Sequence, residues 1–99
     1  MRHPLEIGED RLAEFCRRNG IRRLSLFGSI LGEEFGPDSD VDMLVEFEPG
    51  VVVSLLDMAR MEIELTGMVG RKVDLRTPKE LSRYFRARVL ASAEVQYAA

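Results

Sequence analysis

The hydrophobic positions in the first half of the chain follow two different spacings. Apolar side chains recur every three to four residues over residues 10–19, which predicts a helix that ends at Gly20. An alternation of period two then predicts strands over residues 22–27 and 40–47. A short helix that opens at Gly28 is expected in the turn-rich segment between these strands.

The second half repeats this succession of helix and strand. Polar side chains spaced three to four residues apart, on a mostly apolar background, predict a long helix over residues 51–68. Alternation predicts a third strand over residues 72–76. Thr77 and Glu80 have the spacing of a helix-start capping pair, so a last helix is predicted over residues 78–93.

The predicted last helix carries a basic stripe. Lys79, Arg83 and Arg86 are spaced four and three residues apart, so they are expected to share one helical face. Such a stripe is either a solvated face, which is the more common outcome, or a contact for phosphate or for an acidic partner.

The alternation of helices and strands predicts the fold class. We expect an α/β or α+β domain in which a small mixed sheet of about three to four strands is flanked by about four helices. The chain has 99 residues, so a single domain over residues 1–99 is expected. Its composition, 45% hydrophobic and 31% charged, is that of a globular protein.

Composition also argues against several classes of function. No apolar run reaches the roughly 18 residues of a membrane span, and no secretory signal is visible, so a cytoplasmic protein with no membrane partner is expected. One cysteine and one histidine rule out an internal disulfide and a Cys/His zinc site. A formal net charge of −3, from 14 basic and 17 acidic residues, argues against general nucleic-acid binding. The oligomeric state stays open.

Gly28 and Ser29 stand at the end of the first predicted strand. Glycine lets the backbone approach a ligand closely, and the N–H groups of a helix start, together with a serine hydroxyl, suit a phosphate group. The dipeptide by itself is also typical of an ordinary turn, so it is informative only beside other residues.

Two carboxylates on the second predicted strand carry more information. Asp40 and Asp42 occupy alternate positions, so both side chains leave the same face, about 7 Å apart along the backbone. Neighbouring like charges repel each other, and Mg²⁺ is the obvious cation to relieve that repulsion. Asp74 joins the pair if the third strand lies beside the second. Alternatively, these carboxylates are solvated strand ends or turn caps.

Together, these residues resemble the minimal nucleotidyltransferase family of the polymerase-β-type superfamily. The pattern of that family is a strand, Gly-Ser, a short helix, Asp-x-Asp on the next strand and a third Asp on a later strand. The matching positions lie within residues 24–90 and are Gly28, Ser29, Asp40, Asp42 and Asp74.

The resemblance implies the transfer of a nucleoside monophosphate, AMP from ATP, onto a hydroxyl acceptor. It implies that Asp40 and Asp42 hold two Mg²⁺ ions, that Asp74 completes the second metal site and helps to activate the hydroxyl, and that Gly28 and Ser29 hold the triphosphate. Minimal members are similar to antitoxins that pair with HEPN-type toxins. The implied acceptor is therefore a tyrosine of such a toxin.

Two consecutive positions depart from the pattern of the family. Many members carry Arg-Gly where this chain has Gly32 and Glu33. Either another arginine, such as Arg71 or Arg76, supplies the missing cation, or the chain is a catalytically weak module that masks a toxin stoichiometrically. Transfer to a small molecule or to an RNA end is a further alternative.

Overall fold

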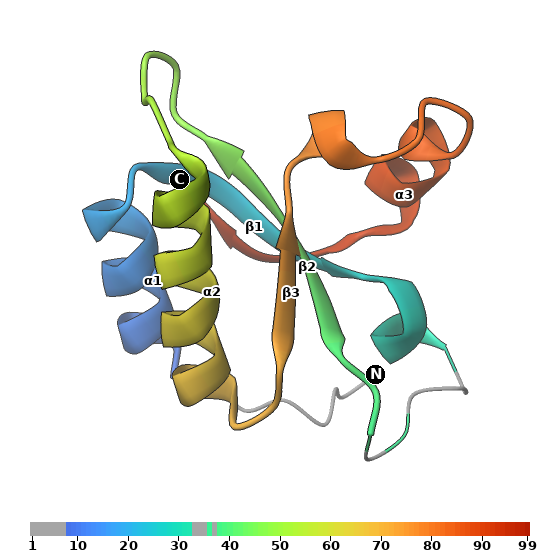
Figure 1. Cartoon of the computed structure of the whole chain (residues 1–99), viewed down its shortest axis with the longest axis horizontal. Helices are drawn as coiled ribbons and strands as arrows, with labels where there is room; N and C mark the ends of the chain where they lie inside the picture. Colours follow the sequence, from blue (N-terminus) through green and yellow to red (C-terminus); the bar gives the residue numbers. More distant parts are fainter. Residues whose placement is uncertain (1–7, 33–35, 37) are drawn as a thin grey trace.

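The computed structural model describes residues 8–32, 36 and 38–99, which form a four-stranded sheet with the order β3–β2–β1–β4 (Figure 1). β1 pairs antiparallel with both of its neighbours, whereas β2 and β3 are parallel. The mixed sheet confirms the predicted fold class. The strands are β1 (Ile21–Phe27), β2 (Val41–Phe47), β3 (Val73–Arg76) and β4 (Glu94–Ala98).

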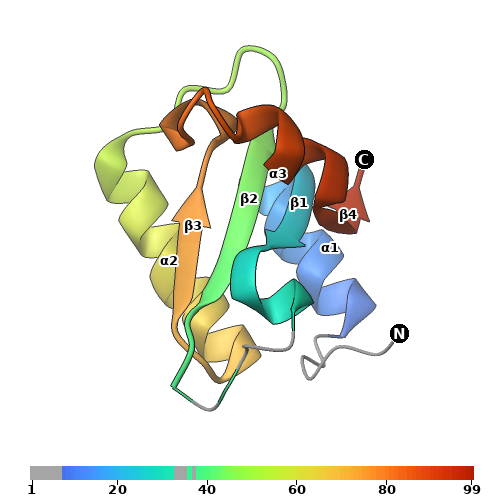
Figure 2. The ribbon, with the colours of Figure 1, turned by 90° about the vertical axis from the view of Figure 1, so that its right-hand side faces the viewer.

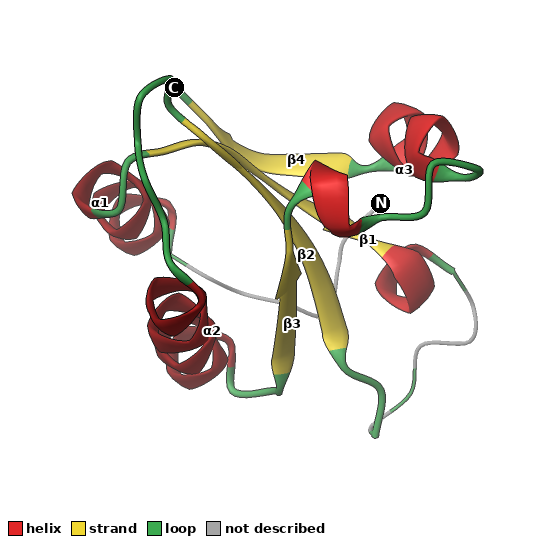
Figure 3. Ribbon diagram, turned by 45° about the horizontal axis from the view of Figure 1, so that its top comes forward, coloured by secondary structure: helices red, strands yellow, loops and turns green. Residues whose placement is uncertain are grey.

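The helices divide between the two faces of this sheet. α1 (Glu9–Arg18) and α2 (Leu55–Val69) lie on one face, and α3 (Arg86–Ser92) lies beyond the other (Figure 3). Within the described ranges, these three α-helices and the 3₁₀ helices η1 (Gly28–Leu31) and η2 (Pro78–Glu80) stand in place of the four or so helices expected. None of the helices in this part of the chain is long and apolar enough to cross a lipid bilayer.

The hydrophobic core fills the space between α1, α2 and the sheet. Successive strand residues face opposite sides of a sheet, so alternate side chains of each strand point into the core. The core residues with the least exposure include Phe15 and Cys16 of α1, Leu65 of α2, and Leu24, Leu26, Val41, Met43, Val45 and Val73 of the strands. The even-numbered residues of β2, Asp42 among them, therefore lie on the other face.

The second face of the sheet is partly covered as well. Leu44 of β2 is 1% exposed and pairs with Ser25 of β1, which is 2% exposed. Neither residue belongs to the main core. Because this layer is buried beside Asp42, the carboxylate is held on a packed surface and not on a free edge.

α2 begins at Leu55, later than the predicted residue 51. Ser54 is its N-cap: the Ser54 hydroxyl accepts the N–H of Asp57 at 3.1 Å, and the Asp57 carboxylate accepts the N–H of Ser54 at 3.0 Å. This capping box satisfies two donors that a helix start leaves unpaired. Residues 51–53 precede this cap and are not helical, so the predicted start at residue 51 is too early.

The prediction of one continuous helix over residues 78–93 is wrong. The Glu80 carboxylate does accept the N–H of Thr77 at 2.9 Å, as the capping pair predicts. The helical turn nevertheless ends after Glu80, and Leu81 is extended with φ −78° and ψ 145°. The segment that follows is irregular until α3 begins at Arg86.

The Arg86 side chain explains this break. Its guanidinium donates to the carbonyl oxygens of Pro78 at 2.8 Å and Leu81 at 3.0 Å. In a continuous helix these carbonyls would accept N–H groups four residues further along the chain. The predicted basic face does not form, since Arg86 turns toward this backbone while Lys79 and Arg83 are exposed.

β4 is a strand that the sequence pattern did not predict. Residues 94–98 pair antiparallel with β1, on the side of β1 away from β2. The segment is short, and five alternating residues give little periodic signal. The strand forms because its backbone pairs with the edge of β1, which lies far away in the sequence.

Candidate active site

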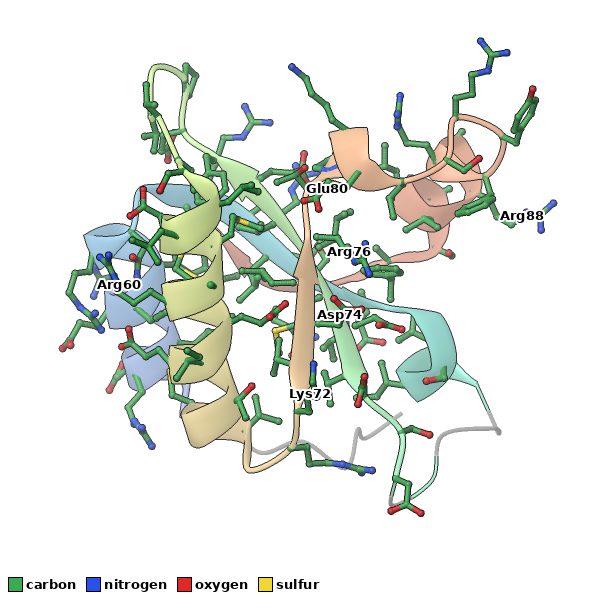
Figure 4. The ribbon with its side chains drawn as sticks, in the orientation of Figure 1. Arg60, Lys72, Asp74, Arg76, Glu80 and Arg88 are labelled. Atoms are coloured by element: carbon green, nitrogen blue, oxygen red, sulfur yellow. The ribbon has the colours of Figure 1, made fainter. Side chains whose placement is uncertain are left out.

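Two aspartates face each other on neighbouring strands. Asp42 of β2 and Asp74 of β3 are direct partners in the parallel pairing. Both side chains are half-buried, on the sheet face opposite the core, and Asp74 lies near the centre of Figure 4. Asp74 was expected to join Asp42 only if the third strand lies beside the second, and β3 does pair with β2.

A pocket of about 260 Å³ opens over these two carboxylates. Strand residues form one wall, and the segment after β3 forms the other. Larger cavities of about 730 and 580 Å³ lie elsewhere and contain none of the predicted site residues, so the smaller pocket over the carboxylates is the candidate active site. The lining residues are Phe27, Asp42, Asp74, Arg76, Glu80, Leu81, Ser82 and Phe85.

Gly28 lies against the carboxylate of Asp42 at the end of β1. It follows directly after β1, whose last residue Phe27 pairs with Asp42, and it begins the turn of η1 seen beside β2 in Figure 2. Its φ is +81°, a left-handed conformation that side chains disfavour. A Cβ here would lie 3.1 Å from Cγ of Asp42 and would clash with the Asp42 carboxylate oxygen. Glycine therefore lets the β1–η1 backbone touch the carboxylate.

Ser29 and Asp40 are less tightly involved. Ser29 is half-buried in η1, where its carbonyl accepts the N–H of Gly32 at 3.0 Å. Asp40 is exposed and stands one residue before β2. Neither side chain lines the pocket. The structure thus joins Gly28, Asp42 and Asp74 closely, and it leaves Ser29 and Asp40 at the margin.

The carboxyl group of Asp42 has a shifted pKa. Burial, and then the negative charges of Asp74 and Asp40, raise the pKa of Asp42 above its usual value. The positive charge of Arg76 lowers the pKa in part. Asp42 is therefore partly buried next to other negative charges, and a cation bound beside it would relieve this repulsion.

The guanidinium of Arg76 forms hydrogen bonds with the carboxylate of Asp74. Its Nε lies 3.2 Å from Oδ1 of Asp74, and its Nη2 lies 3.2 Å from Oδ2. This hydrogen bonding raises the pKa of Arg76 further above its usual value. Arg71 lies elsewhere, because its guanidinium donates to the carbonyls of Gly36 and Ser39 in the loop before β2. Of the two candidate arginines, only Arg76 lines the pocket.

The donor set suits a hard cation only in part. In the described ranges, no three carboxylate, imidazole or thiol side chains are arranged to hold a metal ion together. Asp42 and Asp74 nevertheless offer oxygen donors on one face, and Mg²⁺ is commonly bound by one or two carboxylates with substrate phosphates as further ligands. The pair therefore fits Mg²⁺ that arrives with a nucleotide, with Asp40 close enough to add charge. Glu33 lies outside the described residues.

The wall of the pocket could not be located from the sequence. Glu80, Leu81, Ser82 and Phe85 line it, and all four fall within the segment predicted as one helix. Phe85 is 47% exposed, so it presents an aromatic surface next to the carboxylates. The capping pair at Thr77 was a usable signal, because it placed a turn immediately after β3.

Comparison with known proteins places this geometry in context. The family described as "Nucleotidyltransferase domain" matches residues 9–96. A candidate protein adenylyltransferase of Methanocaldococcus jannaschii is 38% identical over 76 residues, which are 77% of this chain and 80% of that protein. The protein adenylyltransferase MntA of Thermococcus cleftensis is 42% identical over 62 residues, which are 63% of this chain and 61% of that protein.

Solved structures show the same fold. A candidate minimal nucleotidyltransferase superposes with a TM-score of 0.69 at 38% identity, over 86% of this chain and 85% of that one. A chain of a toxin–antitoxin crystal structure with AMP-PNP superposes with a TM-score of 0.72 at 18% identity, over 94% of this chain and 75% of that one. A chain from a tri-AMPylated Shewanella oneidensis HEPN toxin in complex with an MNT antitoxin gives 0.64 at 18% identity, over 92% of this chain and 70% of that one.

Proposed function

The chain belongs to the nucleotidyltransferase domain family, and from this premise we propose that it transfers AMP from ATP onto a hydroxyl group of a partner protein. The observation that carries the proposal is the pairing of Asp42 with Asp74, with the glycine backbone at residue 28 packed against the Asp42 carboxylate. We further propose that residues 1–99 act as one domain.

Each of the site residues predicted from the sequence has a place in this proposal. Asp42 and Asp74, with Asp40 beside them, would hold Mg²⁺ in the presence of the nucleotide. Bound there, Mg²⁺ neutralises phosphate charge and stabilises the oxygens that enter and leave the phosphorus. Gly28 lets the backbone that begins η1 lie against the Asp42 carboxylate, and in this proposal the triphosphate binds there next to the hydroxyl of Ser29.

The bond changes are those of an in-line displacement. The acceptor oxygen bonds to the α-phosphorus of ATP, the bond from that phosphorus to the β-phosphate oxygen breaks, and pyrophosphate leaves. The hydroxyl proton passes to the carboxylate of Asp74 in this proposal. Positioning and charge supply most of the catalysis of phosphoryl transfer, so a shallow pocket with few functional groups is sufficient.

We propose that the acceptor is a tyrosine of a HEPN-type toxin, so that the chain acts as an antitoxin. The relatives named protein adenylyltransferase support the class of reaction. The chains that share the fold and come from toxin–antitoxin complexes support the class of partner. The open 260 Å³ pocket agrees with an acceptor that a second protein presents, because it offers little volume to enclose both substrates.

A second candidate function follows from one contact. Arg76 already forms hydrogen bonds with both oxygens of Asp74. Among the described residues, no group of three potential ligand side chains is arranged to hold a metal ion. A chain with this pocket could mask its partner stoichiometrically with little chemistry. The two functions differ in their need for ATP and in their stoichiometry.

One experiment separates them. The chain is incubated with a candidate HEPN-type toxin, Mg²⁺ and ATP labelled at the α-phosphate, and the label on the toxin is measured at antitoxin-to-toxin ratios well below one. We expect label on the toxin with the wild-type chain and none with Asp42→Asn. Asp10→Asn is the matched control, because Asp10 is exposed on α1, away from the pocket. Equal labelling by Asp42→Asn, or no labelling at all, would contradict the proposed transfer.

A further inference from the structure

Arg76 is the single cationic side chain that lines the carboxylate pocket in the described part of the chain. Three acidic side chains line the same pocket: Asp42, Asp74 and Glu80. An anionic phosphate chain that enters this space meets an excess of negative charge. The position of Arg76 therefore decides how the pocket treats both cations and anions.

The contacts of Arg76 show how it is used in the absence of ligands. It forms two parallel hydrogen bonds to the two oxygens of Asp74, each 3.2 Å long. Like charges on directly opposed strand positions destabilise a sheet, and Asp42 and Asp74 are such a pair. A guanidinium that covers one of them relieves the repulsion. Arg76 thus takes the place of a counter-ion.

The ion pair between Arg76 and Asp74 is partly exposed to solvent. The Arg76 side chain is 46% exposed and that of Asp74 is 30% exposed, so solvent weakens the pair. Arg76 is the last residue of β3, and η2 begins two residues later. Its side chain already lines the pocket, together with Ser82 and Phe85, so a phosphate group that enters this space comes next to the guanidinium.

We infer that Arg76 is a displaceable counter-ion: it holds Asp74 in the ligand-free protein, yields Asp74 to the metal ion, and then binds a phosphate group of the nucleotide. This inference rests on the proposed function and specifies its phosphate contact. The guanidinium hydrogen-bonds to both Asp74 oxygens, so a cation that approaches these oxygens competes with it for their lone pairs and is repelled by its charge. Once displaced, a planar guanidinium pairs with two phosphate oxygens as it does with a carboxylate.

The inference predicts opposite effects of one substitution. Arg76→Gln removes the competitor and one positive charge, so metal alone should bind about three- to tenfold more tightly. The same change removes a phosphate contact, so the nucleotide should bind about tenfold more weakly. A purely structural arginine would move both affinities in the same direction or neither.

The test uses binding and not activity. Free Mn²⁺ is titrated with the full chain and followed by its electron paramagnetic resonance signal. Mg²⁺ with α,β-methylene-ATP, which cannot release pyrophosphate, is titrated by calorimetry. Arg23→Gln is the matched control, because Arg23 is also 46% exposed and pairs across strands with Glu46 at 3.7 Å, outside the pocket. Arg76→Lys keeps the charge without the planar fork.

The outcomes are distinct. We expect Arg76→Gln to tighten Mn²⁺ and weaken the nucleotide, Arg76→Lys to keep Mn²⁺ near the wild-type affinity while weakening the nucleotide, and Arg23→Gln to change neither by more than about twofold. If the wild-type chain binds both ligands and Arg76→Gln weakens both or changes neither, the inference is wrong while the proposed function stands. If the wild-type chain binds neither ligand, the proposed function fails, and this inference fails with it.

Discussion

Replacing Gly28 with alanine should destabilise the protein by about 2–4 kcal/mol, for two reasons that can be separated. The first is backbone strain, since a φ of +81° costs a side-chain-bearing residue about 1–2 kcal/mol. The second is overlap with Asp42, because the new Cβ would lie 3.1 Å from Cγ and 3.3 Å from Cβ of that residue. Overpacking of this kind costs about 1–3 kcal/mol, partly offset by the stiffer unfolded chain.

Two other glycines isolate these contributions. Gly50 has φ +87°, and nothing lies within 4 Å of the position that a Cβ would take there, so Gly50→Ala should show backbone strain alone, about 1–2 kcal/mol. Gly67 lies within α2 with open space around it and no positive φ, so Gly67→Ala should stabilise by about 0.5–1 kcal/mol. The difference between Gly28→Ala and Gly50→Ala then measures the contact with Asp42.

A double-mutant cycle tests the contact directly. Asp42→Ala removes the carboxylate that the new methyl group would meet and leaves the strain at residue 28 in place. Gly28→Ala should therefore cost about 1–2 kcal/mol less in the Asp42→Ala background than in the wild type. Asp42→Asn, which keeps the shape of the side chain, should give no such relief.

The assay is urea unfolding followed by circular dichroism at neutral pH, with the slope compared between variants to verify that the unfolded states are alike. Additive costs of Gly28→Ala and Asp42→Ala would refute the close approach of the η1 backbone to Asp42. A cost for Gly28→Ala no larger than that for Gly50→Ala would refute it as well.

Three further predictions follow from other contacts. Arg86→Lys should lower the free energy of unfolding by about 1–2 kcal/mol and open residues 78–85 to proteolysis. Arg88→Lys should have neither effect, because the Arg88 side chain points away from η2 in Figure 4. Burial raises the pKa of the Cys16 thiol to about 12, so a thiol reagent at pH 8 should modify Cys16 only in urea, and rapid labelling of the native chain would contradict this. The hydrogen bond from Arg18 to Glu64, 2.8 Å long, lowers the pKa of Glu64. The stabilisation from this pair is therefore fully present above the unfolded-state pKa of Glu64 and is lost as the pH falls through the folded-state pKa. Glu64→Gln should lower the free energy of unfolding at pH 7 and change it little at pH 3.

The carboxylate pair could be predicted from the sequence because it depends on local alternation. Asp42 and Asp74 each stand among apolar strand residues whose pattern fixes the face on which the side chain lies. Only the adjacency of the two strands had to be assumed. The nearness of Gly28 to Asp42 was not predicted, because it depends on the antiparallel pairing that places Phe27 opposite Asp42.

The wall of the pocket could not be predicted because it depends on contacts between distant groups. Residues 78–93 contain helix-forming residues and a correct capping pair, so local propensity favours a single helix. Three bonds from Arg86 to the backbone of η2 and Leu81 override that preference. The register of β4 against β1 also includes an irregularity between Leu24 and Ser25, for which the sequence offers no local sign.

The packing of the core fixes the position of Asp42 opposite Asp74. Val41, Met43 and Val45 are at most 1% exposed, so shifting β2 by one residue would place Asp42 in the core and these side chains outside it. The register with β1 shifts only between Ile21 and Arg23, at the end of the strand away from Phe27 and Asp42. Next to the carboxylates the pairing is regular on both sides of β2. The same apolar residues that stabilise the fold therefore hold Asp42 opposite Asp74, and no separate binding energy is needed to assemble the pair.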